Sequence, residues 1–418
     1  MASEVTRIAL SGYYGFNNSG DEAVLLSILT ALERAGEQAG MKLEPVVLSG
    51  DPATTTRLYG VRAVHRMKPG DLLGAIRSCD GLISGGGSLL QDATSSKTIP
   101  YYLAVLKLAQ WFRKPTFIYA QGVGPVRRES FYPYIRHVFN RSAYISVRDN
   151  ESADLLTRMG LQRDRMHVVP DPVMGLRLPE AESGDASAHA MLPVGAAQGF
   201  DEAGRPYVGV SLRFWNEDRT DMTAIADMLK RVCRAQTVHL RFLPFHGQAD
   251  EEASRFVMES LKDEVKLWNG DMSGACDENT VEGDMGDEVP YGASAVTGSS
   301  VMSLCPALEH PQAMLREVSQ CRVLVGMRLH SLIYAASQEI PMLGISYDPK
   351  IDQFLHRLNL TAVGSTARLD ASEAADAILH SLENVEAWQT AHHQVISALK
   401  QEAEQPAQQV AAWLRHKK

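Results

Sequence analysis

The sequence predicts an α/β protein in which two doubly wound parallel sheets face each other across a central cleft. Short runs of β-branched and apolar residues alternate with longer segments of helical apolar spacing, and this holds in both halves of the chain. A stretch without periodicity separates the halves, and 418 residues suffice for two lobes that each bury a core. Ligands of such sheets bind beyond the carboxyl ends of the strands, so we expect the function to lie in the loops that follow strands.

Nine strands are expected from the apolar runs. Those of the first half lie at residues 7–11, 45–49, 81–84, 116–120 and 144–147, with helices between them, for instance over 21–35 and 101–112. Those of the second half lie at 207–212, 239–243, 322–325 and 341–345. Alternation of strand and helix is typical of parallel sheets covered by helices on both faces.

The domain organisation follows from where the periodicity is lost. We expect a first lobe over residues 1–177, a linker or insertion over 178–205, a second lobe over 206–370 and C-terminal helices over 371–418 that cross back to the first lobe. Residues 269–301 hold seven acidic residues and no lysine or arginine. This composition predicts a mobile, solvated loop; an acidic metal site is the alternative, although the ligand spacing of an EF-hand is missing.

The composition argues against several classes of protein. The chain has 41 Lys and Arg against 50 Asp and Glu, a net charge of −9, which argues against a dedicated nucleic-acid binder. Its five cysteines show no CxxC or Cys/His spacing, so we expect reduced thiols and no metal site. No secretory signal and no run of 18 apolar residues is present, so we expect a cytoplasmic protein.

Glycine-rich loops follow three strands of the first half. The loop after the first strand contains Asn17 and Asn18, whose amides suit a sugar or a carboxylate, and then Asp21 at the start of a helix. The N–H groups at a helix N-terminus favour an anion; a plain turn with a helix cap is the alternative. Gly85, Gly86 and Gly87 come next, then Gln121 at the end of another strand. Three consecutive glycines cost conformational entropy, which favours a close approach of backbone and ligand over a bare turn.

Cationic residues stand at the ends of strands in both halves. They are Arg148, Arg213, His246, Arg328 and His330. An arginine can hold a carboxylate or phosphate with two hydrogen bonds, although an ion pair with Asp149 is the alternative for Arg148. A positive charge at a helix N-terminus, as at Arg328 and His330, is unfavourable unless an anion lies there. The set predicts a small, multiply charged anionic ligand that carries phosphate and carboxylate groups.

Eight motifs in order, from about Arg7 to Lys350, resemble the polysaccharide pyruvyltransferase family, in particular its bacterial CsaB type. They are GYYGFNNSGDEAVL, SGGGSLLQD, AQGVGP, ISVRD, SLR, PFH, GMRLHSLIYAA and SYDPKI. The resemblance implies a GT-B-like fold of two Rossmann-type lobes, the first on the acceptor side. It also implies ketal transfer of pyruvate from phosphoenolpyruvate, with release of phosphate and without a cofactor. The implied acceptor is the N-acetylmannosamine of a lipid-diphosphate-linked disaccharide, whose 4,6-pyruvylated product builds secondary cell-wall polymers that anchor surface-layer proteins.

The resemblance also implies roles for individual residues. Arg328 and His330 match its donor-binding motif, Arg148 matches a further arginine, and Asn17 matches a position near the substrate. The reaction needs an acid for C3 of the enol, and His330 is the expected acid–base group. Asp21 or Glu22 is the candidate for activating the sugar hydroxyl. We therefore expect His330 and Arg148 to be catalytic, and Asn17, Asn18, Asp21, Gly85, Gly86, Gly87, Gln121, Arg213, His246, Arg328 and Ser331 to bind substrate.

A lipid-linked acceptor implies a peripheral approach to the inner face of the membrane. Residues 126–148 mix arginines with aromatic side chains and suit either contact with anionic lipid or an ordinary amphipathic helix. Two other functions stay open. One is a GT-B glycosyltransferase or epimerase that uses a nucleotide-sugar in cell-envelope polysaccharide synthesis, and the other is a non-catalytic sensor of a phosphorylated ligand.

Overall fold

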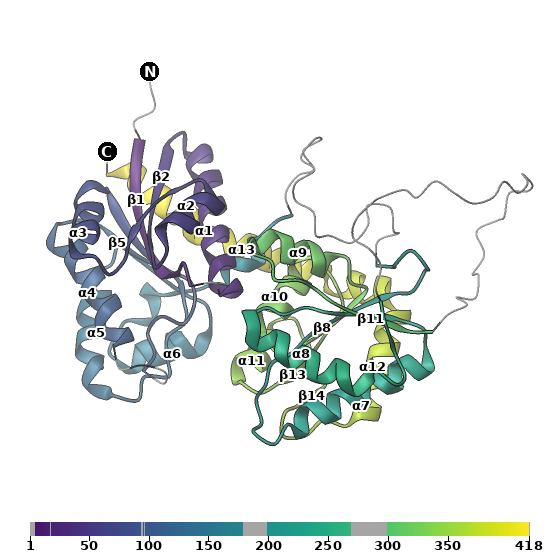
Figure 1. The fold of residues 1–418 in the computed structure, drawn as a ribbon. Helices are drawn as coiled ribbons and strands as arrows, with labels where there is room; N and C mark the ends of the chain where they lie inside the picture. Colours follow the sequence, from purple (N-terminus) through teal and green to yellow (C-terminus); the bar gives the residue numbers. More distant parts are fainter. Residues whose placement is uncertain are drawn as a thin grey trace, which may run out of the picture.

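The computed structural model describes residues 5–16, 18–92, 95, 97–178, 199–268 and 299–417, and they form two α/β lobes (Figure 1). Each lobe contains one seven-stranded sheet in which every paired strand runs parallel to its neighbours. In the first lobe the order is β3-β2-β1-β4-β5-β6-β7. These strands are β1 (Val5–Tyr14), β2 (Lys42–Ser49), β3 (Arg62–His65), β4 (Gly81–Gly85), β5 (Thr116–Gln121), β6 (Tyr144–Val147) and β7 (His167–Val168).

Helices connect the strands of the first lobe. They are α1 (Ser19–Ala39), α2 (Pro52–Tyr59), α3 (Pro69–Ser78), α4 (Thr98–Trp111), α5 (Tyr132–Phe139) and α6 (Asn150–Arg158), with short 3₁₀ segments η1 (Glu129–Phe131), η2 (Arg163–Arg165) and η3 (Pro172–Gly175). Helix α1 begins at Ser19 because the Asn18 side chain accepts a hydrogen bond from the Gly20 N–H, and it ends before Gly40, which adopts the left-handed conformation. The helix therefore starts directly at the carboxyl end of β1.

The second lobe repeats the pattern with the order β10-β11-β9-β8-β12-β13-β14. Its strands are β8 (Tyr207–Ser211), β9 (His239–Phe242), β10 (Lys266–Leu267), β11 (Val301–Leu304), β12 (Val323–Gly326), β13 (Met342–Ser346) and β14 (Gly364–Ser365). Its helices are α7 (Thr220–Ala235), α8 (Gly247–Leu261), α9 (Pro311–Ser319), α10 (Leu329–Ser337), α11 (Pro349–Arg357) and α12 (Ala371–Glu383). The strand order changes direction between β1 and β4 in the first sheet and between β8 and β12 in the second. In parallel sheets a ligand crevice lies at such a point, at the carboxyl ends of the strands.

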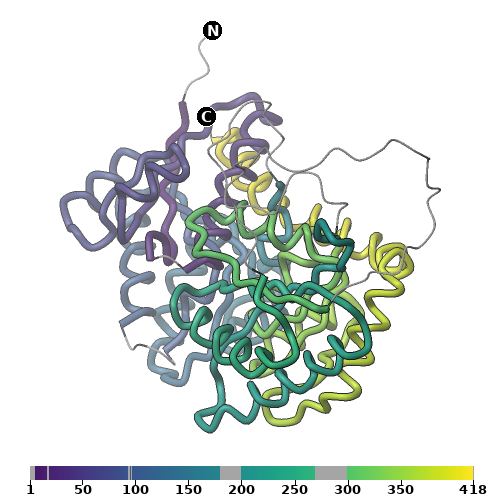
Figure 2. The backbone as a smooth tube through the Cα atoms, turned by 45° about the vertical axis from the view of Figure 1, so that its right-hand side comes forward, coloured from purple at the N-terminus to yellow at the C-terminus, as the bar shows by residue number. Residues whose placement is uncertain are grey.

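The last helix, α13 (Val385–His416), runs from the second lobe back to the first (Figures 1 and 2). It packs against α1 and η3, and the ring of Trp413 meets that of Phe117 edge-on at 5.4 Å between centroids. Glu404 of α13 forms ion pairs with Arg34 of α1 and with Arg177. The C-terminal helix thus ties the two lobes together along one side.

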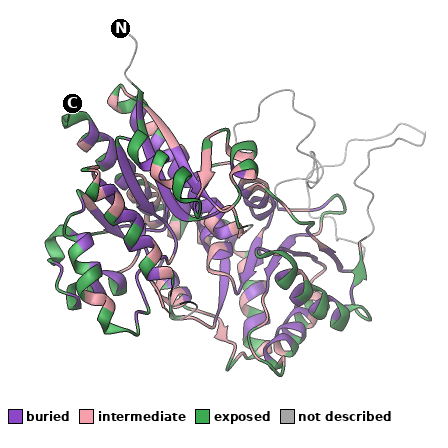
Figure 3. Cartoon of the chain, turned by 60° about the vertical axis from the view of Figure 1, so that its left-hand side comes forward, coloured by how far each residue is buried: buried purple, intermediate pink, exposed green. Residues whose placement is uncertain are grey.

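The buried residues, purple in Figure 3, lie on the strands of both lobes and on the helices that cover them. The apolar ones form three clusters. One lies in the first lobe and one in the second, whereas the third joins α1, α9, α10 and α13 and so includes residues of both lobes. A packed core of this kind is stiff, because large changes of shape would open voids between side chains. The shared cluster therefore holds the facing edges of the two sheets in a defined relation.

The predicted fold class is confirmed, and all nine expected strands are present with small differences at their ends. Five strands were not predicted from the sequence. Four of them, β3, β7, β10 and β14, are two to four residues long and lie at sheet edges, and the fifth is β11. Val301, expected at the end of the acidic loop, instead begins β11 and pairs with His239. Most of the expected linker and acidic loop, residues 179–198 and 269–298, lies outside the described residues.

The stretch 126–148 contains an amphipathic helix. Helix α5 buries Ile135, Val138 and Phe139 in the core of the first lobe, while Tyr134 faces outward. In the part of the chain that the structure describes, no helix combines the length and apolar character needed to span a membrane.

Candidate functional site

The facing carboxyl edges of the two sheets enclose a cleft of about 780 Å³. The loops after β1, β4 and β6 form its wall in the first lobe, and those after β8, β9, β12 and β13 form the wall in the second. Eight of the residues expected from the sequence line it: Asn18, Asp21, Gly87, Arg148, Arg213, His246, Arg328 and His330. Further lining residues that the sequence reading did not single out include Tyr13, Ser88, Tyr102, Tyr347 and Lys350.

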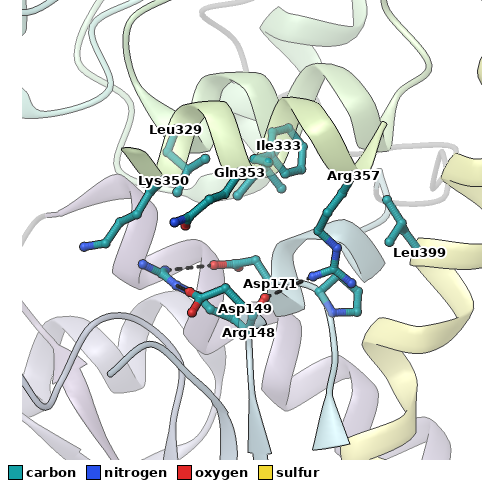
Figure 4. A pocket seen from close by; sticks show the side chains of 11 residues that line it. Arg148, Asp149, Asp171, Leu329, Ile333, Lys350, Gln353, Arg357 and Leu399 are labelled. Carbon is teal, nitrogen blue, oxygen red and sulfur yellow. Dashed lines mark hydrogen bonds and ion pairs between the residues drawn. The ribbon is translucent and has the colours of Figure 1, made fainter. Parts of the chain in front are cut away.

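Two cations from opposite lobes converge on one hydroxyl group. Arg148, at the end of β6, donates from Nη2 to Ser88 Oγ at 2.7 Å, and Lys350 of α11 donates from Nζ to the same oxygen at 3.3 Å. Burial and the nearby positive charge of Arg148 lower the pKa of Lys350. Figure 4 shows both side chains among those that line an adjoining pocket, with Arg148 on the first lobe and Lys350 on the second. Two like charges held this close indicate a site that an anion would stabilise.

Arg148 is held in place from three directions. Its Nη1 lies 3.3 Å from Asp171 Oδ2, and its Nε lies 3.6 Å from Asp149 Oδ2 (Figure 4). A Cβ on Gly122 would come within 2.8 Å of Arg148 Nε, so the glycine after Gln121 makes room for the guanidinium. The ion pair with Asp149, which was the alternative to a ligand-binding role, is present, and Arg148 also lines the cleft.

His330 of α10 lies where the two lobes meet. A Cβ on Gly20 of α1 would approach His330 Nδ1 to 2.4 Å, so the ring rests directly on that glycine. Its Nε2 is buried without a hydrogen-bond partner among the described residues, and Asp171 Oδ2 is 4.0 Å away. Burial lowers the pKa of His330, opposed by Asp171 and assisted by Arg148 and Arg328. The imidazole is thus neutral at pH 7, with one ring nitrogen available to a ligand.

Arg328 is the N-cap residue of α10 and pairs with a fully buried carboxylate. Its Nε donates to Asp250 Oδ2 at 3.0 Å, and its Nη2 contacts the second oxygen of the same side chain. Asp250 also accepts the N–H of His246 at 2.9 Å. The positive charge at this helix N-terminus is therefore balanced in part by Asp250, which sequence spacing alone could not reveal. This bidentate pair fixes the guanidinium at the cleft wall.

Arg213 packs against two neighbouring aromatic rings on the second lobe. Its Nη1 donates to the Tyr347 hydroxyl at 2.8 Å, and its guanidinium lies over the rings of Trp215 and Tyr347. Its Nε has no hydrogen-bond partner among the described residues. An arginine without a carboxylate partner at a cleft wall adds to the attraction for anions.

Asp21 and Glu22 are neighbours in sequence but occupy different environments. Asp21 lines the cleft and accepts a hydrogen bond from Asn18 Nδ2 at 2.6 Å, whereas Glu22 accepts from the Gly15 N–H and from the Tyr59 hydroxyl. Burial raises the pKa of Asp21 to about 7, and Glu22 and Asp171 add to the rise while Arg148 opposes it. Of the two carboxylates, Asp21 is the one that can exchange a proton in the cleft.

Several expected substrate-binding residues do not line the cleft. Gly85 belongs to β4, and Gly86, at φ +68°, leaves no room for a side chain beside Val24. Gln121 is buried and its Oε1 accepts from Ser84, while the Ser331 hydroxyl donates to the Arg328 carbonyl. These residues shape the loops rather than face the cavity, and Asn17 lies outside the described residues.

The remaining chemistry of the cleft is that of charged and polar side chains. Four cationic side chains and two imidazoles line it, against the carboxylates of Asp21 and Asp348. Within the described ranges, no group of three His, Cys, Asp or Glu side chains could hold a metal ion. The cleft wall is predominantly cationic, which suits a small polyanion, and Asp21, whose pKa is raised to about 7, can exchange a proton near neutral pH.

Three comparisons with known proteins show what the chain is similar to. A family model described as polysaccharide pyruvyl transferase matches residues 18–349. A search of curated protein sequences found no match.

Solved structures with a similar fold include a glycosyltransferase from Rickettsia africae ESF-5 (TM-score 0.59, 9% identity, 99% of each chain covered). A UDP-GlcNAc 2-epimerase from Methanocaldococcus jannaschii has a TM-score of 0.56 at 10% identity and covers 91% of this chain and 93% of its own. A UDP-GlcNAc 2-epimerase from Neisseria meningitidis, bound to UDP-GlcNAc, has a TM-score of 0.54 at 9% identity with 93% of both chains covered. At such identities the likeness shows the fold alone, which is GT-B-like.

Proposed function

This chain belongs to the polysaccharide pyruvyl transferase family, and from that premise we propose that it transfers pyruvate from phosphoenolpyruvate to a sugar. The acceptor that we propose is the N-acetylmannosamine of a lipid-diphosphate-linked disaccharide, in the CsaB manner. The product is a 4,6-ketal for a secondary cell-wall polymer, and inorganic phosphate is released. The observation that carries the proposal is the convergence of Arg148 and Lys350 on Ser88 from opposite lobes.

Phosphoenolpyruvate carries its phosphate and its carboxylate on the same carbon, C2, and it suits a cleft with several fixed cations. Arg148 and Lys350 supply one cationic pair, and Arg328 and Arg213 supply further positive charge on the second lobe. Cations that are already in position stabilise the charge that builds up on the departing phosphate. Because Arg148 is held by Asp171 and Arg328 by Asp250, neither needs to reorganise when the donor binds.

His330 is the proposed proton donor to C3 of the enol. Its imidazole is neutral in the free protein, and the negative charge of a bound donor raises its pKa, so donor binding favours the protonated form. Transfer of that proton to C3 leaves C2 electrophilic, and a sugar hydroxyl then adds to C2. The bond from C2 to the phosphate oxygen breaks, phosphate leaves with that electron pair, and a second hydroxyl of the same sugar closes the ketal.

Asp21 is the proposed base for the attacking hydroxyl. It lies on the first lobe, which we propose to be the acceptor side, and its pKa of about 7 suits proton exchange at neutral pH. Glu22 is excluded from this role because its two oxygens already accept the Gly15 N–H and the Tyr59 O–H. The two protons lost by the hydroxyls balance the one gained by C3 and the one taken by phosphate.

The experiment is release of inorganic phosphate from phosphoenolpyruvate, with and without a synthetic N-acetylmannosaminyl–N-acetylglucosamine diphosphate-lipid analogue. We expect release that depends on the acceptor and that falls at least about 100-fold in Arg328→Ala. Arg255→Ala is the matched control, since Arg255 of α8 is exposed, lies outside the cleft and pairs with Glu251 on the preceding turn of the same helix. Circular dichroism of Arg328→Ala checks that the fold survives. Acceptor-dependent release that Arg328→Ala leaves intact would refute the site.

We also propose that the first lobe meets the membrane surface where the acceptor resides. Trp111 at the end of α4 and Tyr134 of α5 are 79% and 65% exposed, and Lys107 contacts His137 between these helices. Aromatic and cationic side chains together suit the headgroup region of an anionic leaflet. We expect less of the Trp111→Ala chain than of the unaltered chain to sediment with phosphatidylglycerol vesicles. If Trp111→Ala and Tyr134→Ala both bind the vesicles as the unaltered chain does, this contact is refuted.

A further inference from the structure

Two exposed aromatic rings lie beside the cleft, at the end of β1 and in the loop that follows it. Tyr13, near the end of β1, and Phe16 stack at 4.2 Å between ring centroids with 12° between their planes. Each is 43% exposed, and Tyr13 lines the cleft together with Tyr102. A stacked pair of large apolar rings left in water beside a polar cleft indicates a surface that a ligand covers.

A buried arginine holds this pair in place. Arg66 is only 7% exposed, donates to the Gly12 carbonyl at 2.8 Å and to the Tyr102 hydroxyl at 3.2 Å, and has no ion-pair partner among the described residues. Its guanidinium carbon lies 6.0 Å from the Tyr13 ring centroid and 5.5 Å from that of Phe16. It also lies over the rings of Tyr101 and Tyr102, the former at 4.4 Å.

The guanidinium of Arg66, which lies near four aromatic rings, fixes the stacked pair of Tyr13 and Phe16 in position. Each ring face attracts the guanidinium, and the hydrogen bond to the Gly12 carbonyl joins Arg66 to β1, the strand that carries Tyr13. The Tyr101 hydroxyl in turn donates to the Arg66 carbonyl. A binding surface that is fixed before the ligand arrives loses less entropy on binding than a mobile one.

We infer that the Tyr13–Phe16 pair is the platform on which a pyranose ring of the acceptor stacks. The inference rests on the proposed function, and it adds the residues that select a sugar. A pyranose presents a face of C–H groups that packs on an aromatic ring, while its hydroxyls stay free for the polar groups of the cleft. The platform belongs to the first lobe and continues the wall that Asp21 lines, so a sugar stacked there extends toward the proposed base.

The kinetic test separates acceptor binding from donor binding. Tyr13→Ala and Phe16→Ala are assayed at saturating phosphoenolpyruvate with the disaccharide diphosphate-lipid analogue varied. We expect the KM for the acceptor to rise about 10-fold, with kcat and the KM for phosphoenolpyruvate within twofold of the unaltered chain. Phe256→Ala, which removes an exposed aromatic ring on α8 away from the cleft, is the matched control and leaves both KM values unchanged. An unchanged acceptor KM, or an equal rise for both substrates, would overturn the platform.

A binding readout keeps the inference testable if no turnover is found. Saturation-transfer NMR with methyl N-acetylmannosaminide, without phosphoenolpyruvate, is expected to show transfer to the ring protons of the sugar. The transfer should disappear in Phe16→Ala and return in Phe16→Tyr. Transfer without turnover would contradict the proposed reaction and retain the platform, whereas no transfer in the unaltered chain, or transfer that survives both alanine variants, would overturn it.

Discussion

Asp21→Asn tests whether the buried Asp21 carboxylate, whose pKa is raised, serves the reaction while lowering the free energy of unfolding. Burial and two neighbouring carboxylates raise the pKa of Asp21 from 3.8 to about 7. Between these two values the folded chain binds more protons than the unfolded chain, so stability falls as pH rises through this window. At about 1.4 kcal/mol per pKa unit, ionised Asp21 lowers the free energy of unfolding by up to about 4 kcal/mol above pH 7.

Asparagine has the same shape and stays neutral, and its side-chain oxygen can still accept from Asn18 Nδ2. We therefore expect Asp21→Asn to be more stable than the unaltered chain by up to about 4 kcal/mol at pH 8 and nearly equal to it at pH 4. The assay is urea denaturation followed by circular dichroism at both pH values. Turnover should fall at the same time, and the rise of activity with pH near 7 should be lost.

Asp51→Asn is the control of opposite sign. Asp51 is an exposed N-cap residue of α2, where hydrogen bonds from Thr54 lower its pKa. At pH 8 the ionised carboxylate accepts the Thr54 N–H and O–H more strongly than a neutral amide does, so its replacement should destabilise the chain there. Turnover should stay unchanged, because the residue does not line the cleft. An Asp21→Asn chain that is no more stable at pH 8 than the unaltered one would refute the account of Asp21.

Three further changes test the geometry of the cleft. Gly20→Ala places a Cβ 2.4 Å from His330 Nδ1, so we expect steady-state turnover to fall at least about 10-fold. Gly74→Ala, in open space on α3, is the control and should leave turnover intact. Equal turnover in the two variants would contradict the contact. Lys350→Gln removes one of the two charges at Ser88, so the KM for phosphoenolpyruvate, measured by phosphate release, should rise at least about 10-fold. Lys262→Gln, at an exposed lysine, is the control. An unchanged KM in Lys350→Gln would argue against a role of Lys350 in donor binding. His330→Ala should abolish incorporation of solvent deuterium into the methyl group of the product, measured by mass spectrometry, and undiminished turnover would exclude His330 as the proton donor.

The alternation of apolar runs sufficed to predict the fold class because buried parallel strands have a strong local signal. Strand β6 begins and ends where the sequence indicated, at Tyr144 and Val147. The missed strands β7, β10 and β14 are two residues long, and they exist only because a neighbouring strand offers hydrogen bonds at the sheet edge. A pairing between segments far apart in sequence leaves little trace in a two-residue run.

The candidate site was partly predictable for a similar reason. Residues directly after strands, such as Arg148 and Arg328, come together because parallel strands bring their carboxyl ends to one edge. The partners that fix them, Asp171 and Asp250, lie elsewhere in the sequence, and so does Ser88, which lies between Arg148 and Lys350. Their roles depend on how the lobes face each other, which no local pattern specifies.

Calorimetric titration with phosphoenolpyruvate is the most direct test of the central claim, namely that the cations at Ser88 hold this donor. We expect binding with a Kd between about 1 μM and 1 mM, weakened at least about 10-fold in Lys350→Gln. UDP-N-acetylglucosamine should produce no heat of binding. Binding of the nucleotide-sugar in place of phosphoenolpyruvate would contradict the account and assign the cleft to a glycosyltransferase or epimerase reaction.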